Sequence, residues 1–294
     1  MPQYSPSSRT DFSFCPRYWW LRRRYRTRRV GYPELCAMGG RAVSEAMASW
    51  NRARIAVQPA TLAITLDTLL EVGLYSLKMQ HHENQQEDRH ITGLKDHAFS
   101  EQVPQLVERG IRALWASDPL QGLQLIAAEQ EYPDHGHARP DVISWNQLGE
   151  KVVDDYKCKF SPFDVNWMDG EFDKHFDGEQ RLTYTHLAGC DLFGIILVLL
   201  QPHTNRKPHP PMVIRRISRV QAHERRLWLN DVRLDDDAMK MVDEQDDPWR
   251  VPGKAAPHRN QYGECPFKTA CVDDSLDESR MKLHYVRIVK GERS

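Results

Sequence analysis

The chain has 294 residues, of which 40% are hydrophobic and 28% charged, with a formal net charge of -1. A chain of this size and composition buries a substantial core, and its length fits one large domain or two small ones. It contains no run of about 18 apolar residues, which excludes a membrane-spanning helix. Its first 20 residues lack the basic-then-apolar order of a secretory signal, so we expect a cytoplasmic protein.

Positive charge is concentrated at the N-terminus, where eight arginines and one acid, Asp11, lie within the first 30 residues. Aromatic residues are interleaved with them in the run RYWWLRRRY. Basic and aromatic side chains together suit a nucleic-acid strand, through its phosphates and its bases. Arg22, Arg23 and Arg24 are the candidates for this contact. The alternative is a solvated basic helix that aids solubility.

In chain order, the first third is predicted to be helical. The N-terminal segment extends to about Gly40, and helices follow near 41–52, 61–80 and 99–115, with a polar loop at 81–90. The periodicity then changes towards two, which predicts strands near 123–132, 138–145 and 151–159. A helix near 178–192 precedes the apolar run GIILVLLQ, whose length and composition predict a strand covered on both faces. A Pro- and His-rich loop at 202–211, a strand at 212–218 and a charged amphipathic helix at 221–245 complete the core.

The stretch ARPDVISWNQLGEKVVDDYKCK, residues 138–159, carries charge inside two predicted strands. Asn146 and Gly149 suit a hairpin loop, so the strands should be antiparallel neighbours. Strand alternation puts Asp155 and Lys157 on one face. Two carboxylates, Asp141 and Asp155, facing each other across the hairpin would repel unless a cation lay between them, and their hard oxygens suit Mg²⁺ or Mn²⁺. The alternative is a salt bridge on a solvent-facing hairpin.

These residues resemble the signature of the PD-(D/E)XK nuclease superfamily, with Pro140-Asp141 followed by Asp155-Tyr156-Lys157. The run VVDDYKCK is similar to the lysine strand of the RecB-type exonuclease branch, which includes CRISPR-associated adaptation nucleases and the nuclease ends of helicase-nucleases. Gln180 and Tyr184 match the QxxxY helix motif of that branch. The opening SPSSRTDFSFCPR and the closing GECPFKTAC also resemble its terminal segments.

The resemblance implies an α/β fold in which helices flank a restriction-endonuclease-like central mixed sheet, within a single nuclease domain over 1–294. Its parts would be a helical N-terminal portion at 1–118, a catalytic sheet core at 119–250 and a C-terminal cysteine segment and tail at 251–294. Asp141 and Asp155 would hold the metal and Lys157 would position the attacking water. Gln180 and Tyr184, four residues apart on one helical face, would steady the bound DNA strand.

One departure from the resemblance concerns the metal. Ser44 stands in GRAVSE where many relatives carry a histidine that assists metal binding, although the adjacent Glu45 would serve if the helix were rotated. A further carboxylate would come from Glu129 or Glu131, with Glu129 favoured by its distance from the hairpin.

A second departure concerns the cysteines. Relatives that hold a 4Fe-4S cluster use one cysteine near the start and three near the end. Here Cys15, Cys265 and Cys271 remain, and Tyr262 occupies the fourth position. Cys36 or His258 would complete a cluster or a zinc site; otherwise the cysteines simply pack.

The function implied is a divalent-metal-dependent DNA nuclease, an exonuclease acting on ends or single strands in recombination, repair or phage DNA processing. Its partners would be DNA and a helicase or recombination protein. The competing hypothesis is a DNA-binding or scaffolding protein that keeps the fold without turnover, favoured by Ser44 and Tyr262. A third is a metal-clasped structural protein with no role on DNA.

Overall fold

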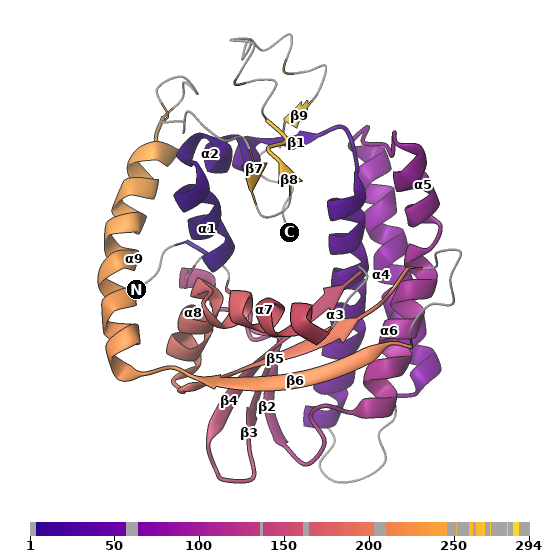
Figure 1. Cartoon of the computed structure of the whole chain (residues 1–294), viewed down its shortest axis with the longest axis vertical. Helices are drawn as coiled ribbons and strands as arrows, with labels where there is room; N and C mark the ends of the chain where they lie inside the picture. Colours follow the sequence, from indigo (N-terminus) through magenta and orange to yellow (C-terminus); the bar gives the residue numbers. More distant parts are fainter. Residues whose placement is uncertain are drawn as a thin grey trace.

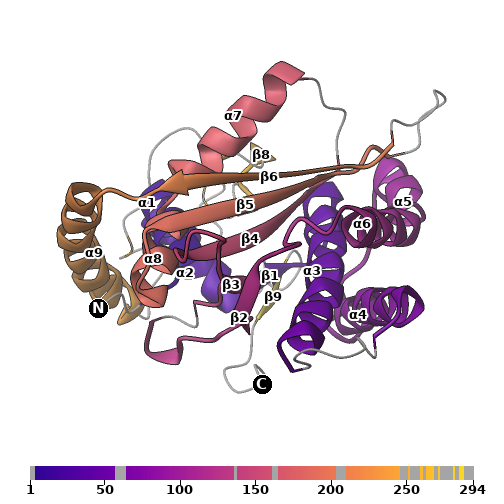
Figure 2. The same ribbon diagram turned by 90° about the horizontal axis from the view of Figure 1, so that it is seen from below.

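A central five-stranded sheet organises the protein, with helices on both of its faces (Figures 1 and 2). The computed structural model describes residues 4–56, 64–135, 138–160, 165–202, 210–245, 251, 259–260, 263–267, 271, 281 and 285–287. The strands are β2 (Gln124–Ala128), β3 (Val142–Trp145), β4 (Lys151–Lys159), β5 (Leu192–Leu199) and β6 (Met212–Arg219), paired in that order. β4 and β5 are parallel and the other pairs are antiparallel, so the sheet is mixed, as predicted.

Local sequence explains the central strands. Every residue of β5, LFGIILVL, is buried, because the strand is hydrogen-bonded on both edges and covered on both faces. Between β3 and β4, the Asn146 side chain accepts hydrogen bonds from the backbone N–H groups of Leu148 and Glu150. Gly149 adopts a left-handed φ of 72° in the same loop. The predicted hairpin at residues 146–150 is therefore confirmed.

One face of the sheet is covered by a bundle of helices from the first third of the chain. It consists of α3 (Tyr32–Ala56), α4 (Leu66–Gln86), α5 (Leu94–Ser100) and α6 (Val103–Ser117). Apolar side chains of these helices form one core with the sheet residues Val142, Tyr156, Ile196 and Val198. The opposite face carries α7 (Val165–Phe176) and α8 (Glu179–Ala188), which pack on Val153 and the alternate residues of β5. The two faces of β4 thus meet two different cores.

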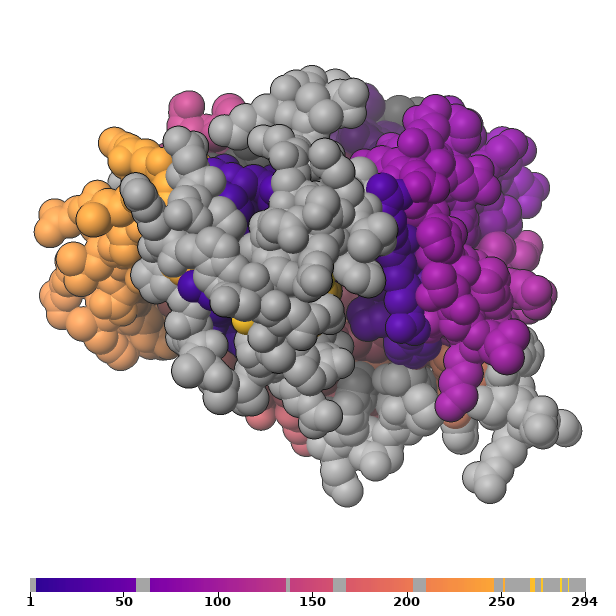
Figure 3. Space-filling model, turned by 90° about the horizontal axis from the view of Figure 1, so that it is seen from above, coloured from indigo at the N-terminus to yellow at the C-terminus, as the bar shows by residue number. Residues whose placement is uncertain are grey.

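The N-terminal segment and the C-terminal end of the chain pack together. α1 (Pro6–Phe14) and α2 (Pro16–Arg24) lead into β1 (Tyr25–Thr27), which pairs antiparallel with β9 (Tyr285–Arg287). Trp19 and Trp20 share a core with Met239 of α9 (Ala222–Asp243) and with Phe267 and Tyr285. The short strands β7 (Arg259–Asn260) and β8 (Gly263–Glu264) pair with each other, and a single 3-10 turn covers Pro133–His135. Figure 3 shows the molecule from above the view of Figure 1, with α9 at the left and helices α4 and α5 at the right.

Several predicted boundaries are wrong. The loop predicted at 81–90 is helical as far as Gln86, because α4 keeps its apolar side on the core while its last turns are polar. The helix predicted at 99–115 is two helices that break at residues 101–102. The strand predicted at 123–132 ends at Ala128, since Glu129 has a φ of 51° that no strand accommodates. The helix predicted to reach 192 ends at Ala188, where Gly189 takes the left-handed conformation of a C-cap.

Two helices differ from the prediction in other ways, and one predicted loop lies mostly outside the described residues. The helix α7 was not predicted, and α3 begins at Tyr32, earlier than the predicted helix. Most of the predicted loop at 202–211 lies outside the described residues. Within the described residues, every helix is too short or too polar to cross a membrane.

Candidate active site

Asp141 and Asp155 lie opposite each other where β3 and β4 meet. The register pairs Val142 with Asp154, so Asp141, immediately before β3, comes opposite Asp155. The Tyr156 backbone N–H donates to Asp141 Oδ2 at 2.7 Å. Burial and the nearby charge of Asp155 raise the pKa of Asp141 well above its ordinary value, against the opposing effects of that hydrogen bond and of Lys157. The two carboxylates therefore repel each other.

Gln180 of α8 links the two charged residues of β4 that share this face. Lys157 forms an ion pair with Asp155, whose side chain is almost fully buried. The Gln180 amide donates to Asp155 Oδ1 at 3.1 Å, and its carbonyl oxygen accepts from Lys157 Nζ at 3.0 Å. One turn further along α8, burial and the charge of Asp155 raise the pKa of Tyr184, while a hydrogen bond with Gln180 acts to lower it. The predicted residues of β4 and α8 thus form one hydrogen-bonded group.

Asp154 points to the other face of the sheet. Its fully buried carboxylate accepts hydrogen bonds from Arg215 of β6, from Nε at 2.7 Å and from Nη2 at 2.9 Å. It lies against Gly194 of β5, where a Cβ would overlap with its Oδ1. The alternation predicted from sequence is therefore confirmed: Asp155, and not Asp154, is the partner of Lys157.

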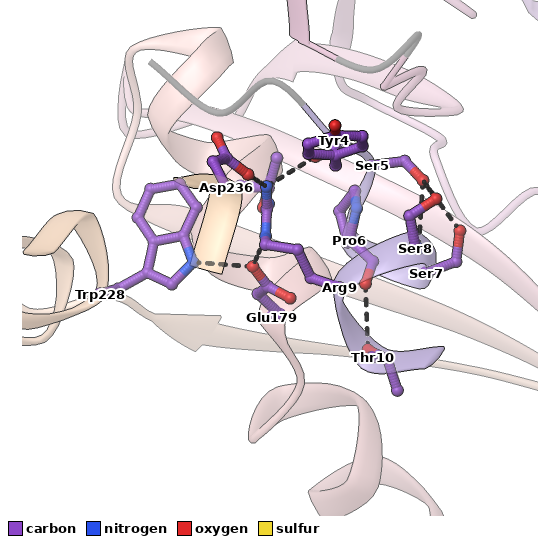
Figure 4. Close-up of polar contacts among 11 residues, drawn as sticks. Tyr4, Ser5, Pro6, Ser7, Ser8, Arg9, Thr10, Glu179, Trp228 and Asp236 are labelled. Carbon is purple, nitrogen blue, oxygen red and sulfur yellow. Dashed lines mark hydrogen bonds and ion pairs between the residues drawn. The ribbon is translucent and has the colours of Figure 1, made fainter. Parts of the chain in front are cut away.

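A buried arginine anchors the start of α8 (Figure 4). Arg9 of α1 is 1% exposed and forms an ion pair with Glu179, the residue before Gln180. Its guanidinium also donates to the Tyr4 carbonyl oxygen at 2.6 Å and to Asp236 Oδ1 of α9 at 3.4 Å. Trp228 Nε1 donates to the same Glu179 oxygen at 3.3 Å. Three helices are joined at the point from which Gln180 reaches the site.

Of the candidates for a third carboxylate, Glu129 is the nearer to Asp141. Its backbone N–H donates to the Asp141 carbonyl oxygen at 3.0 Å, whereas Glu131 is exposed. Arg139 Nη1 lies 3.5 Å from Glu129 Oε2. Burial raises the pKa of Glu129 against the opposing charge of Arg139, and the charge of Glu45 of α3 adds to the rise.

The donor set fits a divalent cation in its chemistry. The hard oxygens of Asp141 and Asp155 face one another, and a cation between them would relieve the repulsion that raises the Asp141 pKa. Across the described ranges of the chain, no three His, Cys, Asp or Glu side chains already stand close enough together to hold a metal ion.

The predicted cysteine ligands lie in the core shared by the N- and C-terminal segments. Cys265 is buried there, and Cys15 and Cys271 pack against the same residues. Burial raises the pKa of Cys271, with a smaller contribution from Cys15 and an opposing one from Arg17. Tyr262 and His258 fall outside the described residues.

Cys36 does not join this set. It packs against the core formed by α3, α4 and α6, so the expectation that it completes the site is wrong. His258, the other candidate for the fourth ligand, lies outside the described residues, so a cluster or zinc site there stays a prediction.

The candidate nucleic-acid arginines are engaged within the protein. Arg22 pairs with Asp11 at 2.6 Å, and Arg23 and Arg24 each lie 3.4 Å from a carboxylate oxygen of Asp243. The Arg24 guanidinium also stacks over the Trp20 ring, 4.0 Å from its centroid. These contacts join α2 to α1 and α9, and binding of a nucleic acid by these arginines stays a prediction.

The mixed sheet flanked by helices, with the motif residues on β4 and α8, matches the α/β fold of PD-(D/E)XK nucleases. The family model described as the PD-(D/E)XK nuclease superfamily matches residues 3–272, and the chain belongs to that superfamily. No curated protein matches the chain significantly.

Two solved structures share some of its architecture. One is a phage-related exonuclease from Haemophilus somnus 129PT, with 14% identity and a TM-score of 0.34, covering 66% of this chain and 91% of that chain. The other is LHK-Exo in complex with dAMP, with 13% identity and a TM-score of 0.27, covering 71% of this chain and 92% of that chain. At such TM-scores, neither likeness adds to what the family model shows.

Proposed function

We propose that the protein is a divalent-metal-dependent DNA nuclease that works as an exonuclease on ends or single strands. The observation that carries the proposal is the connected group of Asp155, Lys157 and Gln180 beside Asp141, on the strand and helix that bear the family motifs. Burying the Asp155 carboxylate costs free energy, so a site that holds it beside Lys157 and Asp141 has a use for it.

Each residue has a role in phosphodiester hydrolysis. Asp141 and Asp155 hold the cation, with Glu129 as a further carboxylate beside Asp141. A bound Mg²⁺ or Mn²⁺ supplies charge stabilisation at the phosphate and a more acidic water. Lys157 orients the attacking water and offsets charge that develops on the phosphate. Gln180 fixes the Lys157 ammonium and the Asp155 carboxylate relative to each other. Tyr184, one turn along α8, steadies the bound DNA strand.

The biological setting proposed is DNA recombination, repair or phage DNA processing in the cytoplasm, with a helicase or recombination protein as partner. Cys15, Cys265 and Cys271 take no part in the proposed chemistry, because they lie in the core shared by the N- and C-terminal segments and not in the core beside Asp155.

A second candidate is a protein that binds DNA through this fold without cutting it. Ser44 favours it, since a hydroxyl replaces the imidazole that relatives offer to the metal and serine is a weaker ligand. Binding does not separate the two functions, whereas cleavage does.

The test is digestion of end-labelled single- and double-stranded DNA with Mg²⁺, Mn²⁺ or EDTA. We expect cleavage that requires the metal and is lost in Asp155→Ala and in Lys157→Ala. Lys151→Ala is the matched control: it lies on the same strand, and its ammonium donates to the Ala188 carbonyl oxygen at 3.1 Å, outside the site. Cleavage that survives in both site variants would contradict the assignment. DNA binding with no cleavage in either Mg²⁺ or Mn²⁺ would favour the second candidate.

A further inference from the structure

A second group of charged side chains lies next to the site, at the end of β4. Glu171 of α7 is buried, with its side chain 3% exposed, and forms an ion pair with Lys159. Lys174 Nζ lies 3.3 Å from the other carboxylate oxygen, and His175 Nε2 lies 3.4 Å from the oxygen that faces Lys159. We call Lys159, Glu171, Lys174 and His175 the Glu171 cluster.

The Glu171 cluster carries more positive charge than its carboxylate balances. Burial acts to raise the pKa of Glu171, but the hydrogen bond and charge of Lys159, together with Lys174 and His175, lower it below its ordinary value, so Glu171 is ionised. One carboxylate then faces two ammonium groups. Lys159 and Lys174 are also accessible, with side chains 32% and 63% exposed. The cluster presents a net positive charge to solvent.

His175 connects the Glu171 cluster to the active site. Burial, followed by the charges of Lys157 and Lys159, lowers its pKa to about 4 despite the opposing effect of Glu171. An imidazole that responds to both lysines lies within the field of both. Lys157 and Lys159 both act on His175, which packs against Glu171, so the Glu171 cluster lies beside the active site.

The spacing along β4 matches a polymer of phosphates. Lys157 and Lys159 have the same parity on the strand and so share a face, with a rise between them of about 6.6 Å. Neighbouring phosphates along an extended nucleic-acid strand are separated by a comparable distance. We propose that Lys159 and Lys174, held in place by Glu171, bind the phosphate next to the one that is cleaved. This inference rests on the proposed function, and its ligand is a phosphodiester group of the bound DNA strand.

A role in stability alone does not explain why Glu171 holds two lysines. Lys159 alone neutralises Glu171, and α7 already packs on the sheet through the buried Phe172. The second ammonium, on Lys174, is mostly exposed and adds little to the anchoring of the helix. Buried Glu171 instead holds both ammonium groups on the side of the sheet where Asp155 and Lys157 lie.

The binding test measures the affinity of a short single-stranded deoxyoligonucleotide in EDTA at several salt concentrations. Each phosphate contact on a single strand contributes about 0.7 to the slope of log affinity against log salt. We expect Lys159→Met to reduce that slope by about 0.7, and Lys174→Gln to reduce it in the same direction. The parent would then lose about 2.5-fold more affinity than Lys159→Met over a fourfold rise in salt.

Controls keep the binding test decisive. Lys151→Met, on the same strand and outside the Glu171 cluster, should leave the slope at the parent value. Melting curves show whether each variant is folded, and the exposed position of Lys174 makes Lys174→Gln a safe second variant. If both folded variants keep the parent slope, the inference is overturned.

The cleavage test shows which phosphate of the DNA strand the Glu171 cluster contacts. Substrates carry one neutral methylphosphonate linkage, either next to the cleaved bond or several nucleotides away. The adjacent neutral linkage should slow the parent by about tenfold, the value of one lost charge-assisted hydrogen bond, and should slow Lys159→Met by less, because only Lys174 then remains to contact that phosphate. Equal slowing of the parent and the variant would overturn the inference while leaving the nuclease proposal intact. Changed salt slopes in a protein that never cuts would support the subsite and reject the nuclease.

Discussion

Replacing Arg9 with methionine is expected to destabilise the protein by about 3 to 5 kcal/mol, the cost of removing one member of a buried ion pair. Methionine keeps much of the length of the side chain but removes its charge. Arg9 is 1% exposed and contacts the carboxylates of Glu179 and Asp236, so the change leaves two largely buried acids without their cation. Since Glu179 precedes Gln180, the nuclease rate is expected to fall as well.

The loss of stability should depend on pH. Burial raises the pKa of Glu179, and Arg9 acts to lower it, so the pKa rises further in the variant. Folded Glu179 then binds a proton more tightly than the unfolded chain does, and stability falls as the pH rises from the unfolded pKa to the folded one. The loss of unfolding free energy in Arg9→Met relative to the parent is therefore smaller in acid than near neutral pH.

The assay is urea unfolding followed by tryptophan fluorescence, at about pH 4 and about pH 7.5, on either side of the ordinary glutamate pKa. Arg22→Met is the matched control, because its ion pair with Asp11 is 55% exposed on the arginine side and is expected to contribute about 0 to 1 kcal/mol. Adding Glu179→Gln to Arg9→Met should restore part of the stability by removing the unpaired charge. If Arg9→Met costs no more than Arg22→Met, or if its deficit is the same at both pH values, the reasoning is refuted.

Two further substitutions test the two faces of β4. Gly194→Ala would push a methyl group into Asp154 Oδ1 and break its contact with Arg215, so we expect a loss of about 3 to 5 kcal/mol in urea unfolding; an unchanged unfolding midpoint would contradict this. Gln180→Ala removes the amide between Asp155 and Lys157, and we expect cleavage to slow by about 10- to 100-fold while the melting temperature changes little. A parent-like rate would show that Lys157 is held adequately by Asp155 alone.

The strands of the site could be predicted because their signals are local. The strand at 151–159 was predicted with the boundaries that β4 has, since its apolar alternation and the Asn146 and Gly149 loop both lie within a few residues. The same alternation separated Asp155 from Asp154. The spacing of Gln180 and Tyr184 placed both on one helix for the same reason.

Long-range contacts could not be predicted in this way. Arg9 looks like one of many surface arginines, and nothing nearby in the sequence shows that Glu179 and Asp236, 170 and 227 residues away, enclose it. The Glu171 cluster was missed for a related reason: α7 was not predicted, so its acid had no assigned position over β4. Charge compensation between distant elements is a property of the fold, and a local pattern does not encode it.

The pairing of β1 with β9 bears on how the polypeptide is made. Tyr25 and Arg287 become neighbours only after about 260 residues of intervening chain have been synthesised, and closing a loop of that length costs about 5 kcal/mol in entropy. Until then Trp19 and Trp20, which are buried against the C-terminal segment in the finished fold, have no cover from it. The aromatic surface of α2 is therefore completed late, and we expect its burial to be among the last events of folding.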